Sequence, residues 1–365
     1  MKVTKNPHTA AWLDEAMIET IESIKRVDEK GLLYKMNCVH DYYGKTIVHM
    51  LKQMGTIDAG CSAFSTYNVE GKMLTGRNYD YKHFDNKGEL TGLNVVVRCA
   101  PEGKYRSIGV ADAYWLDAQN RTFSMGALDD GLTDLSHTVL LPYICMDGIN
   151  EKGLSVSILE LYLKKGEAHV NQNEEGKEKV IHTVLMRYML DECETVDEAI
   201  TMAKRYNVIK TNNSDFHIFI TDRVGKAVVL EWRYNTLYIT ETNAVTNFYV
   251  GFDDAEDVYR KGDLVENFVK LDNTAKTYHY GYGHGYHRFT GIISALERYI
   301  DYTEETYVTK MTDEEARDIL RGAAQNSGTE ATSMTQYSVL YNAMDLSAKV
   351  WVNQNYNMQY NFVIK

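Results

Sequence analysis

The chain has 365 residues, of which 44% are hydrophobic and 25% charged, a balance typical of a folded, water-soluble protein. Its net charge of −12 excludes nucleic acids and anionic membranes as general partners, since both require a basic surface. The five cysteines have no C-x-x-C spacing, and no apolar run is long enough to span a membrane. We therefore expect a cytoplasmic protein without disulfides or an integral membrane segment. A secreted protein that has lost its signal peptide would have the same sequence.

The first sixty residues are predicted to be helical. Apolar residues recur at helical spacing from Trp12 to Ile24, with acidic residues between them. A second helix is expected over 44–54, and the breaker-rich stretch 54–60 predicts a loop. We therefore treat residues 1–60 as a helical leader, separate from the segment 61–365.

The pattern changes to that of strands at Cys61. Strands are predicted over 61–67 and 72–78, joined by a turn at Glu70-Gly71, and over 94–99 and 105–110. The polar, glycine-containing stretch 147–153 predicts a turn that leads into a strand over 154–159.

Helices and strands follow one another in blocks over the rest of the chain. Helices are predicted at 180–190, 195–205, 256–270, 289–301 and from 312 onward, with capping boxes at Thr195 and Thr312. Strands are predicted at 216–221, 226–231, 236–240, 337–341, 348–353 and 358–364. Because short turns join most neighbouring strands, we expect antiparallel sheets. The predicted fold class is α+β, with two sheets between layers of helices in one domain.

Cys61 is the strongest candidate for a catalytic residue. It follows Gly60, and a glycine tolerates the strained backbone that attack by the next side chain on its carbonyl would require. If the Gly60–Cys61 bond is cut, Cys61 supplies both a thiol nucleophile and an α-amine. An α-amine has a pKa of roughly 7.7–8.0 and can serve as the base. The sequence therefore suggests a cysteine nucleophile made by self-cleavage.

Arg77 and Asp80 support this hypothesis. Both lie at the end of the strand predicted to pair with that of Cys61, so Arg77 could stabilise a thiolate and Asp80 could hold the α-amine. The same residues also suit a buried structural cysteine beside an ordinary Arg–Asp surface pair. Spacing alone leaves both interpretations open.

Five stretches in order resemble the choloylglycine hydrolase family of N-terminal-nucleophile hydrolases, which includes conjugated bile acid hydrolases and penicillin V acylases. They are Cys61-Ser-Ala-Phe with Gly76-Arg77-Asn78-Tyr79-Asp80-Tyr81, Asp147-Gly-Ile-Asn-Glu-Lys-Gly-Leu154, Ala244-Val-Thr-Asn247, His287-Arg288-Phe289, and the closing strands from Tyr337 to Phe362. Acid ceramidase and the N-acylethanolamine acid amidase are relatives of this family. The resemblance covers residues 61–365.

The resemblance implies a function for each matching residue. Cys61 is the nucleophile and its α-amine the base, Arg77 contacts the thiol, and Asp80 orients the amine. Asn247 supplies an oxyanion-hole donor, and Arg288 holds the polar network around the nucleophile. The implied fold is the four-layer αββα sandwich of antiparallel sheets, preceded by a propeptide. The implied activity is hydrolysis of a linear amide of a small N-acyl substrate, without a cofactor and in a dimer or tetramer.

Two alternatives to a hydrolase remain open. An acyltransferase of the same fold would pass the acyl group from Cys61 to an amine. A non-catalytic binding protein on this fold would keep the pocket and lose the chemistry. The joint presence of Cys61, Arg77, Asp80, Asn247 and Arg288 argues against the second alternative.

The sequence departs from the family at three points, one of which is Phe248, which follows Asn247 where the family usually has Asn or Ser. Glu160 stands where the family often has Asn or Tyr, so a carboxylate is expected near the oxyanion hole or the substrate. The leader is also far longer than the segment that bile acid hydrolases lose, and is similar to those of the acid ceramidase branch. Fatty acyl or aryl-acyl amides are therefore preferred to bile acid conjugates as substrates.

Aromatic residues are candidates for an acyl pocket, although each would equally suit the core. They are Tyr81, Phe84, Tyr114, Trp115 and Tyr162. The stretch 278–287 contains His279, His284 and His287, but its spacing matches no structural zinc site, and we expect a Gly/Tyr loop there instead of a metal site.

Overall fold

The computed structural model describes residues 8, 10–43, 60–117, 123–163, 167–210, 214–251, 282–301, 308–309, 311–326 and 333–364. The helices predicted at 44–54 and 256–270 lie outside these residues. No helix within them is long and apolar enough to cross a lipid bilayer.

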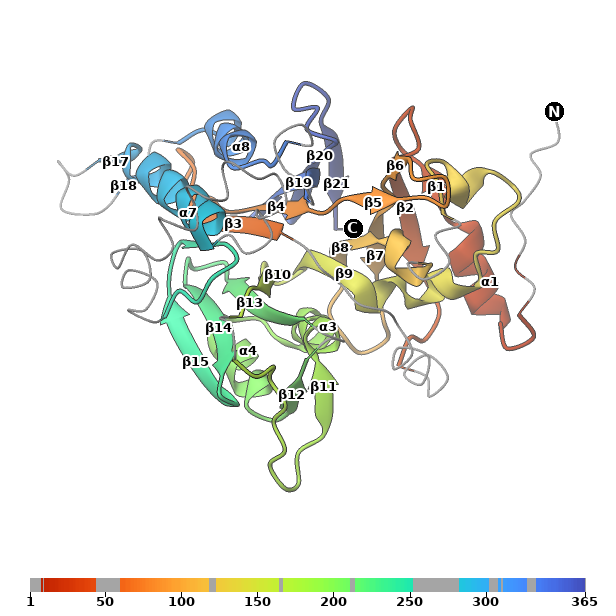
Figure 1. Cartoon of the computed structure of the whole chain (residues 1–365), viewed down its shortest axis with the longest axis horizontal. Helices are drawn as coiled ribbons and strands as arrows, with labels where there is room; N and C mark the ends of the chain where they lie inside the picture. Colours follow the sequence, from red (N-terminus) through yellow and green to blue (C-terminus); the bar gives the residue numbers. More distant parts are fainter. Residues whose placement is uncertain are drawn as a thin grey trace.

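The larger of two main sheets has nine strands (Figure 1). In spatial order they are β1 (Lys25–Arg26), β2 (Leu33–Cys38), β7 (Asn94–Cys99), β8 (Ser107–Asp112), β9 (Cys145–Asn150), β10 (Ser155–Leu161), β13 (Asp215–Thr221), β14 (Ala227–Arg233) and β15 (Thr236–Glu241). Neighbours are antiparallel except β2 and β7, which are parallel.

The second main sheet has six strands, all antiparallel to their neighbours. In spatial order they are β16 (Ala244–Val245), β3 (Gly60–Tyr67), β4 (Met73–Asp80), β19 (Thr335–Asn342), β20 (Ser347–Val352) and β21 (Tyr360–Val363). The two sheets meet face to face. Thr75 of β4 and Thr221 of β13, for example, share a hydrogen bond of 2.6 Å between their hydroxyls.

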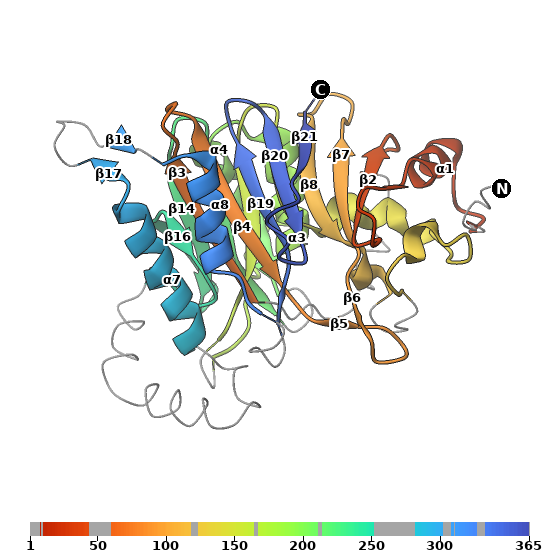
Figure 2. The ribbon, with the colours of Figure 1, turned by 90° about the horizontal axis from the view of Figure 1, so that it is seen from above.

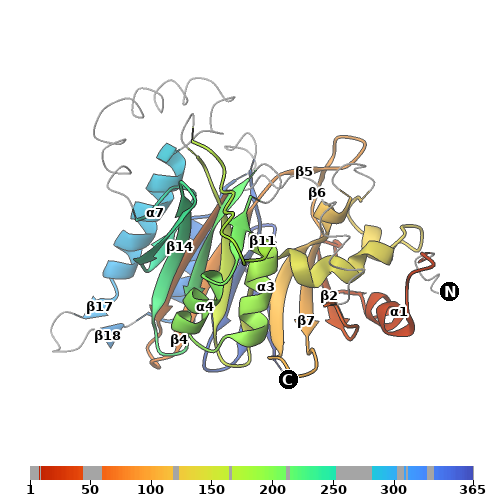
Figure 3. The ribbon, with the colours of Figure 1, turned by 90° about the horizontal axis from the view of Figure 1, so that it is seen from below.

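Helices cover the outer face of each sheet. Helices α7 (Tyr282–Glu297) and α8 (Asp313–Gly322) contact β3, β4 and β19 of the six-stranded sheet, and Figure 2 shows them on its outer side. Helices α3 (His182–Glu192) and α4 (Val196–Ala203) contact β9, β10, β13 and β14, as Figure 3 shows. The predicted α+β class and the αββα sandwich are therefore confirmed.

The remaining elements are short. They are α1 (Glu15–Glu22), the 3-10 helices η1 (Ala113–Leu116), η2 (Ala127–Asp129) and η3 (Ser136–Ile144), and the strand pairs β5 (His83–Phe84) with β6 (Leu90–Thr91), β11 (Lys179–Ile181) with β12 (Asn207–Ile209), and β17 (Ile300–Asp301) with β18 (Val308–Thr309).

The β3–β4 hairpin forms where the sequence predicts it. Gly71 has a φ of +72°, a conformation that favours glycine, and the Asn68 side chain accepts the N–H groups of Glu70 and Lys72 (both 3.0 Å). The strands then pair in register from Tyr67 opposite Met73 to Gly60 opposite Asp80. This register fixes which side chains stand beside the first residues of β3.

The prediction that the whole leader is helical is wrong. Helix α1 is present, with its N-cap at Asp14, but β2 is a strand that pairs in parallel with β7 along its whole length. Tyr34, Met36 and Cys38 are buried, whereas Lys35 and Asn37, which alternate with them, are exposed. This alternation has the period of a strand, which the helical interpretation overlooked. The division of the chain at residues 60 and 61 stays a prediction.

The ends of two further elements, β9 and α7, differ from the predicted ones. Residues 147–150 belong to β9 because both of its neighbours, β8 and β10, continue to pair there, so the turn shrinks to three residues ending at Gly153 (φ +86°). Helix α7 begins at Tyr282, within the stretch predicted as a loop, and ends four residues early. The Thr246 hydroxyl donates to the carbonyl of Gly285 (2.8 Å) and ties this first turn to the strand before it.

Candidate active site

Cys61 lies on the inner face of the six-stranded sheet, directly opposite Tyr79 on β4, and is 1% exposed. Its Sγ is 3.2 Å from Arg77 Nη2, and the same nitrogen donates to the carbonyl of Ile158 on the other sheet (2.8 Å). Arg77 is the neighbour of Tyr79 on the same face of β4, because side chains on one face of a strand are two residues apart. Arg77 thus links the thiol to the facing sheet.

Arg77 is held on its far side by a carboxylate. Its Nε lies 3.1 Å from Asp147 Oδ2, and the hydroxyls of Tyr337 and Tyr341 both donate to Asp147. Burial opposes the charge on Arg77, but the thiol of Cys61, the Tyr337 hydroxyl and the Asp147 carboxylate raise the guanidinium pKa above its ordinary value. The arginine is therefore a fixed positive charge beside the sulfur.

The cysteine thiol itself is not ionised by this arrangement in the uncut chain. Complete burial raises the pKa of the Cys61 thiol, and the opposing effect of Arg77 only partly offsets it. The thiol also accepts the backbone N–H groups of Asp80 and Glu160, which favour the thiolate. The sulfur thus lies among donors that could stabilise a negative charge once one forms.

The backbone of Cys61 is held by Asn247 and Arg288. The amide nitrogen of Cys61 donates to Asn247 Oδ1 (3.1 Å), and Arg288 Nη1 donates to the Cys61 carbonyl (2.9 Å). Arg288 also donates from Nη1 to Asp80 Oδ2 (2.9 Å) and from Nη2 to Asn247 Oδ1 (2.6 Å). The Thr335 hydroxyl donates to the other oxygen of Asp80 (2.6 Å).

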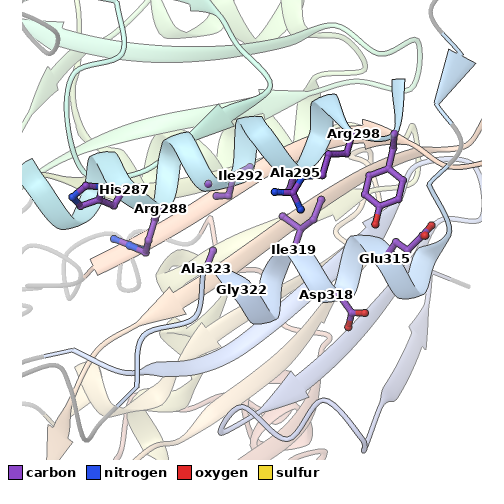
Figure 4. Close-up of a pocket in the computed structure, with 12 residues that line it drawn as sticks. His287, Arg288, Ile292, Ala295, Arg298, Glu315, Asp318, Ile319, Gly322 and Ala323 are labelled. Atoms are coloured by element: carbon purple, nitrogen blue, oxygen red, sulfur yellow. The ribbon is translucent and has the colours of Figure 1, made fainter. Parts of the chain in front are cut away.

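The structure therefore brings all five residues of the predicted constellation together. Asn247 follows β16, which pairs with β3, and Arg288 comes from α7, which packs on the outer side of β3. Figure 4 shows Arg288 at one end of a groove between α7 and α8, with a volume of about 450 Å³. The catalytic functions of these residues stay predictions, since the geometry shows only their proximity.

Glu160 lies beside this cluster, but its backbone makes the closest contacts with it. Its N–H faces the Cys61 sulfur, and its carbonyl accepts Asn247 Nδ2 (2.7 Å). Its carboxylate is buried and accepts the Ser214 hydroxyl (2.9 Å). The departure from the family at this position therefore changes a side chain bonded to Ser214, while the backbone groups beside Cys61 are independent of residue type.

The five aromatic candidates for the acyl pocket lie in different parts of the structure. Tyr114 and Trp115 are buried in η1, and Tyr81 is half-buried with its ring centre 4.9 Å from that of Trp115. Phe84 on β5 is partly exposed, and its carbonyl accepts the Tyr114 hydroxyl (3.0 Å). Tyr162 follows β10, and its N–H donates to the carbonyl of Asn247 (3.1 Å). Tyr162 thus binds a residue of the predicted constellation through its backbone, and an acyl pocket stays a prediction for all five.

Sequence reasoning assigned no role to two groups next to the cluster. Asp147 was visible within the stretch 147–154 but had no assigned partner, because only the packing of one sheet on the other brings it to Arg77. The buried pair of His83 and Asp112, which contacts Tyr79, joins residues of β5 and β8 and has no signal in the sequence. Among the described residues, no three His, Cys, Asp or Glu side chains gather as a metal site would require.

Comparison with known proteins agrees with this geometry. The family model of the linear amide C-N hydrolases, choloylglycine hydrolase family, matches residues 61–363. Two solved variants of the conjugated bile acid hydrolase from Clostridium perfringens have a TM-score of 0.53 at 16% and 15% sequence identity, covering 83% of this chain and 92% of theirs. Penicillin V acylase from Agrobacterium tumefaciens has a TM-score of 0.49 at 16% identity, covering 80% of this chain and 83% of its own. No curated protein matches the sequence. At such identities the two bile acid hydrolase structures show a shared fold.

Proposed function

Since this chain belongs to the linear amide C-N hydrolases of the choloylglycine hydrolase family, we propose that it is a self-processing cysteine amidase. The Cys61 thiol first attacks the carbonyl carbon of Gly60, and the peptide bond becomes a thioester. Water then hydrolyses the thioester, which releases residues 1–60 with a free carboxylate and leaves Cys61 with a free α-amine. The mature enzyme uses that thiol to attack an N-acyl amide.

One observation supports this proposal above the others. All three polar groups of Cys61 are held from different elements: the sulfur by Arg77, the amide nitrogen by Asn247 and the carbonyl by Arg288. A structural cysteine needs none of these contacts, because a free cysteine packs as a small hydrophobic residue. A nucleophile whose own amine is the base needs both its sulfur and its nitrogen fixed.

The proposed reaction follows from these contacts. The α-amine of Cys61 takes the thiol proton, and the sulfur attacks the substrate carbonyl to form a tetrahedral intermediate. The amine then protonates the leaving nitrogen as the C–N bond breaks, leaving an acyl thioester. Water, deprotonated by the same amine, releases the carboxylic acid. The N–H groups beside the sulfur would stabilise the negative charge that develops.

The experiment is intact-mass analysis and N-terminal sequencing of the purified protein. We expect a new terminus at Cys61, hydrolysis of simple N-acyl amides, and loss of both in Cys61→Ala. Cys145→Ala is the matched control, since Cys145 is equally buried and its Sγ contacts the carbonyl of Leu141 (3.5 Å), a residue with no proposed part in the reaction. Full activity in a preparation that retains all 365 residues would contradict the proposal.

A further inference from the structure

Tyr79 lies beside the nucleophile and has no part in the chemistry described above. It is the cross-strand partner of Cys61 and is fully buried on the same face of the sheet. Its ring centre is 5.0 Å from the guanidinium carbon of Arg77, and the ring of Tyr337 lies 5.7 Å from that carbon. The two rings stack on each other with centres 5.3 Å apart. Arg77 therefore borders a pair of aromatic rings, which attract a cation through their faces.

The hydroxyl of Tyr79 is fixed at both of its hydrogen-bonding functions. It donates to Asp112 Oδ2 (2.9 Å) and accepts Nε1–H of Trp115 (2.8 Å). Burial and the Asp112 carboxylate raise the pKa of Tyr79 well above its ordinary value, so the phenol stays protonated and remains a donor. The ring thus cannot rotate or slide without breaking a buried hydrogen bond.

Asp112 is in turn held by residues outside the site. The backbone N–H of Tyr114 donates to its Oδ1 (3.1 Å), and His83 Nε2 contacts its Oδ2. The ring of His83 stacks on that of Tyr114 with centres 3.8 Å apart. A continuous set of buried contacts therefore leads from η1 and β5 through Tyr79 to Arg77.

We propose that Tyr79 is a positioning residue for Arg77 and, through it, for the Cys61 thiol, with its hydroxyl anchored by Asp112 and Trp115. This inference rests on the proposed function, because it assigns Tyr79 a part in activating that nucleophile. Among the residues that the structure describes, Arg77 and Asp80 are the charged side chains that act on the thiol, and of these two Arg77 contacts the Tyr79 ring. Tyr79 therefore acts on the thiolate through the placement of one charge.

Tyr79→Phe tests this inference, with Tyr249→Phe as the matched control, because Tyr249 also belongs to the segment that remains after cleavage. The Tyr249 hydroxyl is also buried, donates to the carbonyl of Trp232 (3.2 Å), and the ring lies under a buried arginine (Arg233, 5.0 Å from the ring centre). Each variant loses one buried hydroxyl and the hydrogen bond that it donates. Only Tyr79→Phe should change the reaction.

For cleaved Tyr79→Phe enzyme we expect kcat to fall about 10-fold with KM little changed, because less exact placement weakens stabilisation of the transition state. The rate of Cys61 alkylation by iodoacetamide should be measured as a function of pH. Its pH profile should shift to higher pH, because the thiolate loses part of its stabilisation by Arg77. Tyr249→Phe should keep the wild-type kcat and pH profile.

A purely structural Tyr79 would give the same kcat and alkylation profile as the control, which would overturn the inference. If Tyr79→Phe does not fold, Trp115→Phe removes the donor to the Tyr79 hydroxyl and keeps an aromatic ring in its place, and the same two measurements decide. Failure of the proposed function is distinguishable from both outcomes. In that case the wild-type protein would either remain uncut or keep its activity after Cys61→Ala.

Discussion

Two buried arginine centres in this molecule have nearly the same composition and different surroundings. In the first, the Arg77 centre, Arg77 lies between Cys61 and Asp147 with two tyrosine hydroxyls on the carboxylate. In the second, the Arg187 centre, Arg187 of α3 contacts Asp191 (2.6 Å) and Cys99 Sγ (3.7 Å).

The hydroxyls of Tyr42 and Tyr43 donate to Asp191 as those of Tyr337 and Tyr341 do to Asp147. Each centre thus has a cysteine, an arginine, an aspartate and two tyrosines. The composition of a buried polar cluster therefore does not distinguish a catalytic site from a structural one.

The pKa shifts of the two cysteines alone would favour the Arg187 centre over the Arg77 centre. A hydrogen bond from Cys38, together with Arg187, lowers the pKa of Cys99 despite its burial, whereas burial raises the pKa of Cys61 in the uncut chain. What distinguishes Cys61 is its position after Gly60 and the contacts to its own nitrogen and carbonyl. Fixing the backbone of the cysteine, in addition to its sulfur, is what a chain-terminal nucleophile requires.

Matched arginine substitutions should separate the two centres most strongly. Arg77→Lys keeps the charge but cannot contact Cys61, Ile158 and Asp147 together, so we expect kcat to fall by about 100-fold or more. Arg187→Lys should leave kcat of the cleaved enzyme within about 3-fold and lower the free energy of unfolding by about 3 kcal/mol. Steady-state kinetics and chemical denaturation of both variants provide the test, and an equal loss of kcat would remove the distinction.

Replacing Tyr42 and Tyr43 by Phe should weaken the Arg187 centre and leave the Arg77 centre unchanged. Tyr42 and Tyr43 belong to the leader, and both donate to Asp191 of α3. In the uncut Cys61→Ala chain, replacing both by Phe should lower the free energy of unfolding by about 3 kcal/mol, because each hydrogen bond to a charged group contributes about 1.5 kcal/mol. Urea denaturation measures the change. A loss below about 0.5 kcal/mol would mean that these contacts do not anchor the leader.

The smallest predicted effect is a pH dependence of the folding stability that comes from His182, the first residue of α3. Burial, with a contribution from His217, lowers the pKa of His182 from 6.5 to about 3. Below pH 6.5 the unfolded chain therefore binds a proton that the folded chain does not, and stability falls as the pH falls from about 6.5 toward 3. Between pH 7.5 and 5.5 this group should account for about 1.4 kcal/mol of lost stability.

His182→Phe should remove that part of the pH dependence, since a phenyl ring does not titrate and suits the neighbouring rings of Phe216 and Trp232. Denaturation curves at the two pH values, for the wild type and the variant, give the difference. If the wild type and the variant lose the same free energy of unfolding between the two pH values, the protonation of His182 does not contribute to the pH dependence. The effect concerns the layer of α3 and should leave the alkylation profile of Cys61 unchanged.

Much of the fold could be predicted because local rules agree with the final structure. The β3–β4 hairpin follows from two strand-like runs around a turn with Asn68 and Gly71, and α8 follows from the complete capping box between Thr312 and Glu315. The leader strand β2 is only six residues long, and its alternation is a weak signal because its stability depends on pairing with β7, about sixty residues later.

The sequence by itself determined which residues are the candidates for the site. Cys61, Arg77, Asp80, Asn247 and Arg288 were chosen from their motifs, and the structure brings these five together. Only the tertiary structure decided what surrounds them: Asp147 behind Arg77, the Tyr79 hydroxyl between Asp112 and Trp115, and the backbone of Glu160 instead of its carboxylate beside the sulfur. The physical reason is that motifs record residues of one strand or loop, whereas these contacts exist only because two sheets and a 3-10 helix pack against one another.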